Sequence, residues 1–403
     1  MKQLSSPERA LADRIDQPAM LAQTEGWTAI NSGTGNLAGL GLQAQELADA
    51  FAALPGAIAL REAAPVSSVD AAGNDIELSH GRHLVLNVRP EAERRFLLTG
   101  HMDTVYPADH PFQAGCRIDE DTLNAPGAAD MKGGLAVILH ALLAFETGRA
   151  AQAVGYDVLI NSDEETGSLS SAGLIAELAR GKASALTYEP SVLPDGTLAH
   201  ARGGSGNYSI VVTGRSAHAG RNPHDGRNAL VAAAALAVAL KDMEHADISV
   251  NPAKIEGGSA NNVVPDNAVL RFNIRPRTRP AAEEFQTHLA ILLRTIEARH
   301  EVALRLHGGL TRPPKPVDAR AQRLFDLVAD TSEALGHPLG WQASGGVCDG
   351  NNIAACGVPV VDTMGVRGGS IHSADEYLIV ASLSERAALS AVVLHRLAMG
   401  APL

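Results

Sequence analysis

The sequence predicts an α/β protein in which a three-layer domain with a mostly parallel sheet is interrupted by a smaller α+β domain. The chain has 403 residues, more than the roughly 250 to 300 at which a single core usually stops growing, so two domains are expected. Short runs rich in Leu and β-branched residues alternate with longer helical runs. Hydrophobic residues make up 45% of the chain but aromatic residues only 3%. Such an aliphatic core suits helices layered on a sheet.

Alternating buried strands and helices define the larger domain. Its predicted elements are strands 84–88 and 96–99, helix 133–147, strand 157–161, helix 170–180 and strand 185–188. The same pattern resumes later with helix 317–335, strand 358–362 and helix 382–398. We therefore expect one α/β domain formed by residues 1–203 and 314–403.

The intervening residues predict the smaller domain. It begins after a glycine cluster at 203–206 and ends at Pro313, Pro314 and Pro316, where neither a helix nor a strand continues easily. Its predicted elements are strand 207–213, helix 225–243, strand 268–275, helix 280–299 and strand 301–306. We expect residues 204–313 to form an inserted domain.

Composition narrows the range of partners and compartments. The formal net charge of -12 disfavours binding to nucleic acid or to anionic membrane surfaces. The three cysteines are odd in number and include no C-x-x-C pair, so they indicate neither a disulfide framework nor a structural zinc site. This pattern fits a reducing compartment. The N-terminal segment has no apolar core of a signal peptide, and we find no long uninterrupted apolar run. We expect a soluble, cytoplasmic protein.

Histidines and carboxylates follow several of the predicted strands. His101 comes directly after an apolar strand, and the carboxylate of Asp103 is placed to hold its imidazole ring in one tautomer. Glu189 ends another strand, and His372 lies in a glycine-rich loop after the last strand. Because open α/β sheets bind ligands at the carboxyl ends of their strands, these side chains are candidates for one site.

Two acidic segments are open to more than one interpretation. Asp130 begins a predicted helix, where an N-cap aspartate is ordinary, but the glycines on both sides allow a closer backbone approach than a cap needs. Glu164 and Glu165 end a run of three acids after a strand, which is either a solvated turn or a cation site. The following Thr-Gly-Ser indicates a tight turn and favours the cation site.

This mixture of imidazoles and carboxylates suits zinc better than calcium or magnesium. Two divalent cations would offset three ligating carboxylates and leave a positive charge that acidifies a bound water, whereas the carboxylates alone would repel one another. The spare carboxylate, Glu164, would then act as a general base. We expect two Zn²⁺ per chain, for which Co²⁺ or Mn²⁺ could substitute.

At these positions the sequence resembles the dinuclear-zinc amidohydrolases and metallopeptidases that include glutamate carboxypeptidase, acetylornithine deacetylase, aminoacylase and succinyl-diaminopimelate desuccinylase. The matching stretches are I-N-S-G-T-G-N (30–36), G-H-M-D-T-V-Y-P (100–107), A-D-M-K-G-G (129–134), D-E-E-T-G-S (163–168), Y-E-P (188–190), G-R-S-A-H-A-G (214–220), N-N-V-V-P (261–265) and the loop around His372. The first stretch is most similar to the glutamate carboxypeptidase branch, whereas Tyr-Glu-Pro resembles the deacetylase branch.

The resemblance implies a role for each candidate residue. The implied metal ligands are His101, Asp130, Glu165, Glu189 and His372, with Asp130 shared by both ions. Glu164 would be the general base that activates water, and Asp103 would orient His101. The resemblance also implies a cis peptide bond at Asp130–Met131.

In the inserted domain the resemblance implies contributions to substrate binding and assembly. His218 would stabilise the oxyanion in the neighbouring subunit of a homodimer formed through residues 204–313. Asn262 and Arg275 would bind a substrate carboxylate, to which a guanidinium is well matched. Arg275 also stands among other arginines that could be ordinary surface charge.

The expected activity is hydrolysis of an amide or peptide bond next to a free carboxylate by a glutamate carboxypeptidase-like exopeptidase. An N-acyl-amino-acid deacylase is the alternative. A peptide with an acidic C-terminal residue, an N-acyl amino acid, a dipeptide and a carbamoyl compound all stay open, because specificity resides in loops. Cys348 is expected to be a buried filler near the site.

Two other classes of protein are less consistent with the sequence. The stretch from Gly33 to Ala38 spells a dinucleotide-binding fingerprint of an oxidoreductase, but the run before it is a poor strand and position 53 is alanine where an acidic residue is required. A catalytically silent binding protein of the same fold would be expected to lose Glu164, which is retained.

Overall fold

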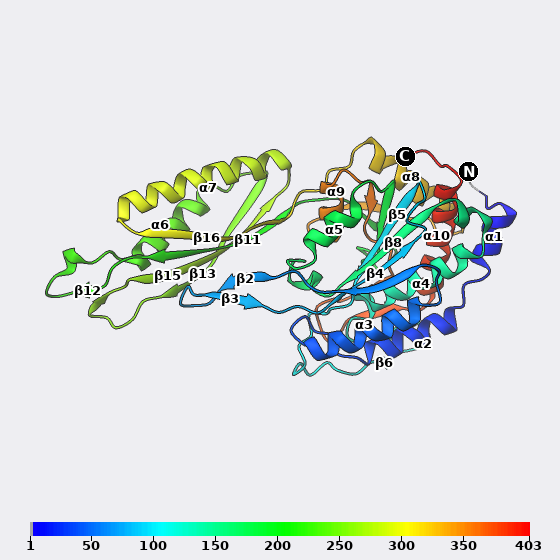
Figure 1. Ribbon diagram of the computed structural model, residues 1–403, viewed down its shortest axis with the longest axis horizontal. Coiled ribbons are helices and arrows are strands. Elements are labelled where there is room, and N and C mark those ends of the chain that lie inside the picture. The colour runs from blue at the N-terminus through cyan, green and yellow to red at the C-terminus, as the bar shows by residue number, and fades with distance from the viewer. Residues whose placement is uncertain (1–2) are drawn as a thin grey trace. The chain divides into compact units, whose positions relative to one another are not determined.

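A computed structural model describes residues 3–403 and places them in two units (Figure 1). Unit 1 contains the chain up to Ala64, Ser79–Ala201 and Val317–Leu403. Unit 2 contains Pro65–Leu78 and Arg202–Pro316. The sequence analysis assigned Pro65–Leu78 to the larger domain, whereas this segment packs with unit 2.

Unit 1 is built on a six-stranded mixed sheet with the order β1-β4-β8-β5-β9-β18. Its strands are β1 (Ala57–Arg61), β4 (His83–Val88), β5 (Arg95–His101), β8 (Gly155–Asn161), β9 (Ser184–Thr187) and β18 (Val360–Val361). The pairings β5–β8, β5–β9 and β9–β18 are parallel, whereas β1–β4 and β4–β8 are antiparallel. Parallel strands end at the same edge, so β8, β5 and β9 deliver the residues after them to one place.

Helices cover both faces of this sheet, which gives the expected three layers. Alternate residues of a strand point to opposite faces. Leu84 and Leu98 join one core, and Val85 and Leu97 join the other. The first core includes α1 (Ser6–Ala12), α2 (Gln17–Thr28), α3 (Leu37–Phe51), α4 (Gly133–Glu146), α8 (Ala319–Ala334) and α10 (Ala381–Ala398), and the second includes α5 (Ala172–Ala179) and α9 (Asp349–Ala355).

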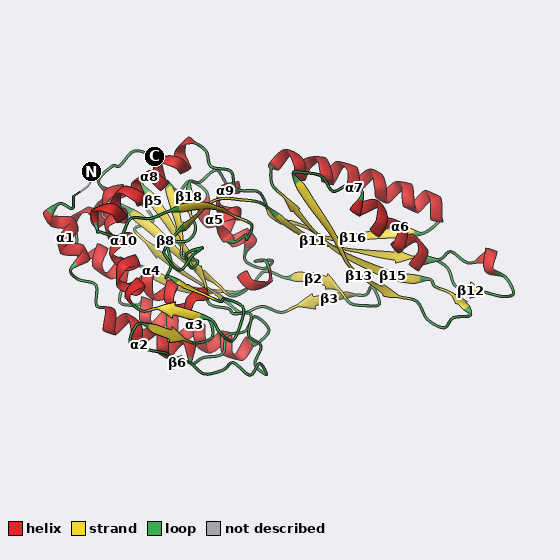
Figure 2. Cartoon of the chain, turned by 180° about the vertical axis from the view of Figure 1, so that it is seen from behind, coloured by secondary structure: helices red, strands yellow, loops and turns green. Residues whose placement is uncertain are grey.

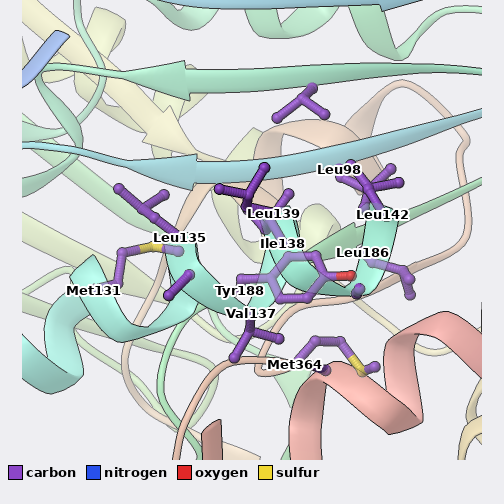
Figure 3. Close-up of a cluster of buried hydrophobic side chains, with 14 of the residues drawn as sticks. Leu98, Met131, Leu135, Val137, Ile138, Leu139, Leu142, Leu186, Tyr188 and Met364 are labelled. Carbon is purple, nitrogen blue, oxygen red and sulfur yellow. The ribbon is translucent and has the colours of Figure 1, made fainter. Parts of the chain in front are cut away.

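Helix α4 lies in the middle of the first core. Figure 3 shows its buried side chains, among them Leu135 and Ile138, gathered with Leu98 and Leu186 of the sheet and with Tyr188, which follows β9. The stretch Ala128–Glu146 is long and, by mean hydropathy, apolar enough to cross a membrane, although Asp130 and Lys132 interrupt its apolar run. Because 89% of its apolar window is buried inside the protein, core packing accounts for its composition.

Outside the central sheet, unit 1 contains two smaller sheets of short strands. A four-stranded sheet has the order β19-β20-β7-β6, and β10 pairs with β17. Their bounds are β6 (Cys116–Arg117), β7 (Thr122–Asn124), β10 (Leu198–Arg202), β17 (Trp341–Ser344), β19 (Gly368–Gly369) and β20 (Tyr377–Ile379). His372 therefore lies in the hairpin between β19 and β20.

Unit 2 contains an antiparallel sheet with the order β13-β15-β11-β16, and both of its α-helices lie on one face (Figure 2). Its main elements are β11 (Ser205–Thr213), α6 (Ala229–Lys241), β13 (Ile248–Gly257), β15 (Asn267–Pro276), α7 (Arg279–His300) and β16 (Ala303–Arg312). Ile210 and Val212 face the helices, whereas Val211 packs on Val69. Val69 belongs to the hairpin of β2 (Val66–Val69) and β3 (Asp75–Leu78), which covers the other face. This packing explains why Pro65–Leu78 belongs to unit 2.

Candidate metal centre

His101 is the last residue of β5 and is only 1% exposed. Its Nδ1 lies 3.0 Å from the carbonyl oxygen of Asp103 and 3.4 Å from the Oδ1 atom of that residue. The nearest partner of the ring is thus the backbone carbonyl rather than the carboxylate expected from the sequence. A hydrogen bond from Nδ1–H to this carbonyl leaves Nε2 as the atom that can bind a metal.

The carboxylate of Asp103 holds the loop that carries the two glutamates. Its Oδ1 accepts the backbone N–H of Glu164 at 3.1 Å, and its Oδ2 accepts that of Glu165 at 3.1 Å. Oδ2 also accepts the hydroxyl of Thr34 at 2.8 Å. Asp103 therefore joins the end of β5, the loop after β8 and the N-terminal stretch 30–36, and the sequence analysis did not identify Thr34 individually.

Asp130 lies in the distorted turn Ala128–Lys132 that precedes α4. The N-cap of α4 is Lys132, so the interpretation of Asp130 as an ordinary N-cap is wrong. The peptide bond Asp130–Met131 is cis, which confirms that prediction. Asp130 Oδ1 lies 3.2 Å from the Nε2 atom of His101, and Oδ2 lies 3.3 Å from that of His372. One carboxylate thus faces both histidines, with one oxygen for each.

Further carboxylates stand beside each histidine. Glu165 Oε2 lies 3.3 Å from His372 Nε2, and Glu189 Oε2 lies 3.7 Å from His101 Nε2. Two overlapping groups have donor atoms within 4.8 Å of one another, namely His101, Asp130 and Glu165, and His101, Glu164 and Glu189. Within residues 3–403, the buried Oε1 of Glu165 has no hydrogen-bond partner. An unmatched acceptor in such a cluster suits a bound cation.

The electrostatics of the metal-free cluster follow from these contacts. Burial alone would lower the pKa of His101, but the charge of Glu189 and hydrogen bonds with Asp103 and Asp130 raise this pKa well above its ordinary value. Hydrogen bonds with Asp130 and Glu165 raise the pKa of His372 to about 10. Burial and the charge of Asp130 raise the pKa of Glu165 to about 7. Without metal, protons take the place of the positive charge that the carboxylates require.

The three candidate substrate-binding and catalytic residues in unit 2, His218, Asn262 and Arg275, do not lie together within that unit. His218 ends β12 (Ala217–His218) and is paired opposite Val263 of β14 (Val263–Val264), and the N–H of Ala219 donates to the carbonyl oxygen of Asn262 at 2.9 Å. His218 and Asn262 are therefore exposed neighbours.

Arg275 lies at the other end of the unit 2 sheet. It is 275 - 267 = 8 residues beyond the start of β15 at Asn267, or about 27 Å at the usual rise of a strand. Asn267 pairs with Thr213, at the end of β11 that leads to His218. Arg275 of one chain is therefore far from Asn262 of the same chain.

The structure excludes the dinucleotide fingerprint as a binding loop. The stretch from Gly33 to Ala38 runs from the loop after α2 into the first two residues of α3, and Asn36 caps α3 by accepting the N–H of Gly39 at 3.1 Å. A dinucleotide-binding loop must follow a strand. Cys348 is buried, as expected, and occupies the N-cap position of α9.

The sequence analysis missed one buried carboxylate at the site, Glu376, which contacts the turn that carries Asp130. It lies four residues after His372 in H-S-A-D-E-Y, beside the exposed Asp375. Because one acid following another in a loop usually indicates a solvated segment, only its proximity to His372 could have identified it.

The fold and the site together define a metal-dependent hydrolase, because two histidines and a set of carboxylates converge on one shared aspartate at the carboxyl edge of an α/β sheet. Residues 97–396 match Peptidase family M20/M25/M40. The chain belongs to this family and is a metallopeptidase or amidohydrolase that cleaves amide bonds.

Comparisons with individual proteins agree with this assignment. The chain is 27% identical to carboxypeptidase G2 of Pseudomonas sp. (strain RS-16) over 391 residues, which cover 96% of this chain and 91% of that protein. It is 30% identical over 323 residues to succinyl-diaminopimelate desuccinylase of Xanthomonas oryzae pv. oryzae (strain PXO99A), covering 75% of this chain and 83% of that protein.

Solved structures show the same fold. A tripeptidase from Staphylococcus aureus superposes with a TM-score of 0.71 at 23% identity, covering 96% of this chain and all (100%) of that chain. A dinuclear metal-binding peptidase of the M20 family from Bacillus subtilis superposes with a TM-score of 0.65 at 14% identity, covering 95% and 98%.

Proposed function

We propose that this protein is a dinuclear zinc exopeptidase of the glutamate carboxypeptidase type, which cleaves an amide or peptide bond next to a free carboxylate. The observation that carries the proposal is the position of Asp130, whose two oxygens face His101 and His372 at 3.2 and 3.3 Å. The 27% identity to carboxypeptidase G2 over 96% of the chain supports the choice of substrate class.

The donor set fits two zinc ions. Imidazole nitrogens and carboxylate oxygens are ligands that zinc accepts, and Co²⁺ or Mn²⁺ could substitute. One ion would be held by His101, Asp130 and Glu189, and the other by Asp130, Glu165 and His372. When bound, the ions would lower the pKa of a water molecule and polarise the scissile carbonyl.

Glu164 is proposed as the general base. Its carboxylate lies within 4.8 Å of the donor atoms of His101 and Glu189, beside the proposed metal site. There it would take a proton from the attacking water and deliver it to the leaving amine, which typically contributes about 10² to 10⁴-fold in rate. Asp103 supports this role because it binds the backbone N–H of Glu164.

His218 is proposed to donate a hydrogen bond to the oxyanion. The backbone N–H groups of Gly220 and Arg221 both donate to its Nδ1 at 3.1 Å. Nδ1 is therefore an acceptor, so the proton of the neutral ring is on Nε2, which is the arrangement that an oxyanion donor needs.

A homodimer through the inserted domain is proposed to supply His218 to the partner's site. Helix α6 exposes an apolar stripe at helical spacing, in which Val231 is 53% and Val238 65% exposed, with the small Ala234 between them. Such a face suits an interface between two copies. Asn262 and Arg275 lie far apart within one chain, so they would bind one substrate carboxylate only as members of different subunits.

An N-acyl-amino-acid deacylase is the second candidate. The 30% identity to succinyl-diaminopimelate desuccinylase favours it, and so does the Tyr-Glu-Pro stretch ending at Pro190. Both candidates use the same centre and differ in the group beyond the scissile amide. We also propose a cytoplasmic location, with which the lack of a disulfide bond among Cys116, Cys348 and Cys356 is consistent.

One experiment tests the activity and the metal requirement together. Zinc-loaded protein is incubated with parallel panels of dipeptides, peptides ending in acidic residues and N-acyl amino acids, and the released amines are identified. We expect release of a C-terminal acidic residue, about two zinc ions per chain by elemental analysis, and loss of hydrolysis after chelation. Full activity in protein shown to contain no metal would overturn the mechanism, and activity on N-acyl amino acids alone would establish the deacylase.

A further inference from the structure

Glu376 is a buried carboxylate that receives hydrogen bonds from two other segments of the candidate centre. It is 1% exposed. Its Oε1 accepts the backbone N–H groups of Ala129 and Asp130 at 2.9 and 3.0 Å. Its Oε2 accepts the N–H of Gly127 at 3.1 Å and the hydroxyl of Tyr106 at 2.7 Å. Both oxygens are therefore fully engaged.

These hydrogen bonds specify the shape of the turn that carries Asp130. Three N–H groups within four consecutive residues point at one carboxylate, and Gly127 adopts a left-handed conformation with φ of 72° to allow this. Three backbone N–H groups and the Tyr106 hydroxyl stabilise its buried position, and its charge also attracts that of the buried Lys132. Because a buried carboxylate is costly unless its oxygens are satisfied, the turn and Glu376 fix each other.

The same carboxylate connects three ligand-bearing segments. Tyr106 lies five residues after His101, the turn carries Asp130, and Glu376 itself lies four residues after His372. The hydroxyl of Tyr106 also lies 2.8 Å from the carbonyl oxygen of Ser373, beside His372. Movement at Glu376 would therefore alter the spacing of both histidines relative to the carboxylate they share.

We propose that Glu376 is a positioning residue that holds the carboxylate of Asp130 between the two histidines and thereby sets the affinity of the centre for both metal ions. This inference rests on the proposed metal centre. Substitution of residues that orient metal ligands commonly weakens metal binding by about 10- to 100-fold. We expect a loss of that size when the hydrogen bonds to the Asp130 turn are disturbed.

Glu376→Gln is the most informative variant because it keeps the shape of the side chain. One oxygen becomes an NH₂ group, which cannot accept an N–H, so at least one backbone donor of the turn loses its partner. Asp375→Asn is the matched control, since this neighbouring carboxylate is exposed. Val328→Ala, in the core at α8, controls for a general loss of stability.

The experiment measures Co²⁺ binding by titration against a chelating indicator, together with the visible absorption spectrum of the Co²⁺ protein. We expect Glu376→Gln to bind Co²⁺ about 10- to 100-fold more weakly with an altered spectrum, while Asp375→Asn and Val328→Ala retain the wild-type affinity and spectrum. Wild-type affinity and spectrum in Glu376→Gln would overturn the proposal.

A second variant covers the case in which Glu376→Gln does not fold. Tyr106→Phe removes only the hydroxyl donor, so we expect a smaller loss of Co²⁺ affinity in the same direction. Unchanged binding in that variant would equally contradict the proposal. Failure of the wild-type protein itself to bind Co²⁺ would instead overturn the metal centre, so the two failures are distinguishable.

Discussion

Two adjacent glutamates after β8 have different neighbours and should respond differently to substitution. Glu165 lies 3.3 Å from His372, whereas Glu164 groups with His101 and Glu189. We expect Glu164→Gln to retain both metals but to lose at least ~10²-fold in turnover, the low end for a general base. Glu165→Gln should lose metal. Metal content and kcat measured on the same preparations check this division.

This assignment would be contradicted if Glu164→Gln and Glu165→Gln had the same metal content and the same kcat. If both variants lose metal equally, Glu164 is a ligand of the ion beside His101 and Glu189 rather than the base. Asp103 is common to both glutamates because it binds both backbone N–H groups. Its substitution is therefore unsuitable for separating their roles.

His372 gives the metal-free protein a stability that depends on pH. Its pKa is raised from 6.5 to about 10 in the folded chain, first by hydrogen bonds with Asp130 and Glu165. Between these values the folded state keeps a proton that the unfolded state has lost, so stability falls as pH rises through this window. We expect the Tm of chelated wild-type protein to fall more between pH 7 and about 10 than that of His372→Gln. Parallel profiles for the two proteins would show that His372 lacks this proton.

At the scale of elements, the start of α4 packs closely against the backbone of the segment that follows β9. A Cβ atom on Gly134 would lie 2.2 Å from the carbonyl oxygen of Tyr188, the residue before Glu189. Gly134→Ala must therefore displace either α4 or the end of β9, and we expect both the Tm and the metal content to fall.

Gly173→Ala near the start of α5 is the matched control for this change. A Cβ there meets nothing within 4 Å, and a helical Gly→Ala change gains up to about 1 kcal/mol. Thermal unfolding of the two variants and elemental analysis make the comparison. A Gly134→Ala protein as stable and as metal-rich as Gly173→Ala would show that the backbone contact is not limiting.

The elements that the sequence predicted best are those buried on both sides. Strands β5 and β8 are buried along almost their whole length because helices cover both faces of the sheet, and each contains a short apolar run. The ends of these runs also identified His101 and the glutamate pair. In contrast, β3 alternates polar and apolar residues in Asp-Ile-Glu-Leu, but it is only four residues long and exposed at every position. The packing of its hairpin on the unit 2 sheet is a contact between distant segments, which local patterns do not encode.

The same reasoning separates the predicted from the missed residues of the site. His101 ends a strand, Glu165 and Glu189 follow strands, and strand ends can be predicted from apolar runs. Glu376 accepts the backbone N–H of Asp130, which lies 246 residues earlier in the chain. A backbone donor has no characteristic side chain, so no spacing in the sequence indicates such a partner.

At the scale of the whole molecule, the proposed catalytic groups come from different units. Glu164 belongs to unit 1 and His218 to unit 2. If His218 acts across a homodimer, each complete active site contains Glu164 of one subunit and His218 of the other. His218→Ala should then be slow but metal-replete, with a loss of about 10² to 10³ in rate, as for other oxyanion donors.

Complementation between two inactive variants distinguishes donation within a chain from donation between chains. His218→Ala and Glu164→Gln proteins are mixed under conditions in which subunits exchange, and exchange is verified by native mass spectrometry of differently tagged chains. In a heterodimer with donation in trans, one site contains intact Glu164 and intact His218, and the other site lacks both. Activity should therefore return to a fraction of the wild-type value. With donation in cis every site stays defective and no activity returns. Absent recovery despite verified exchange, or a monomer at the assay concentration, would remove His218 from the proposed active site.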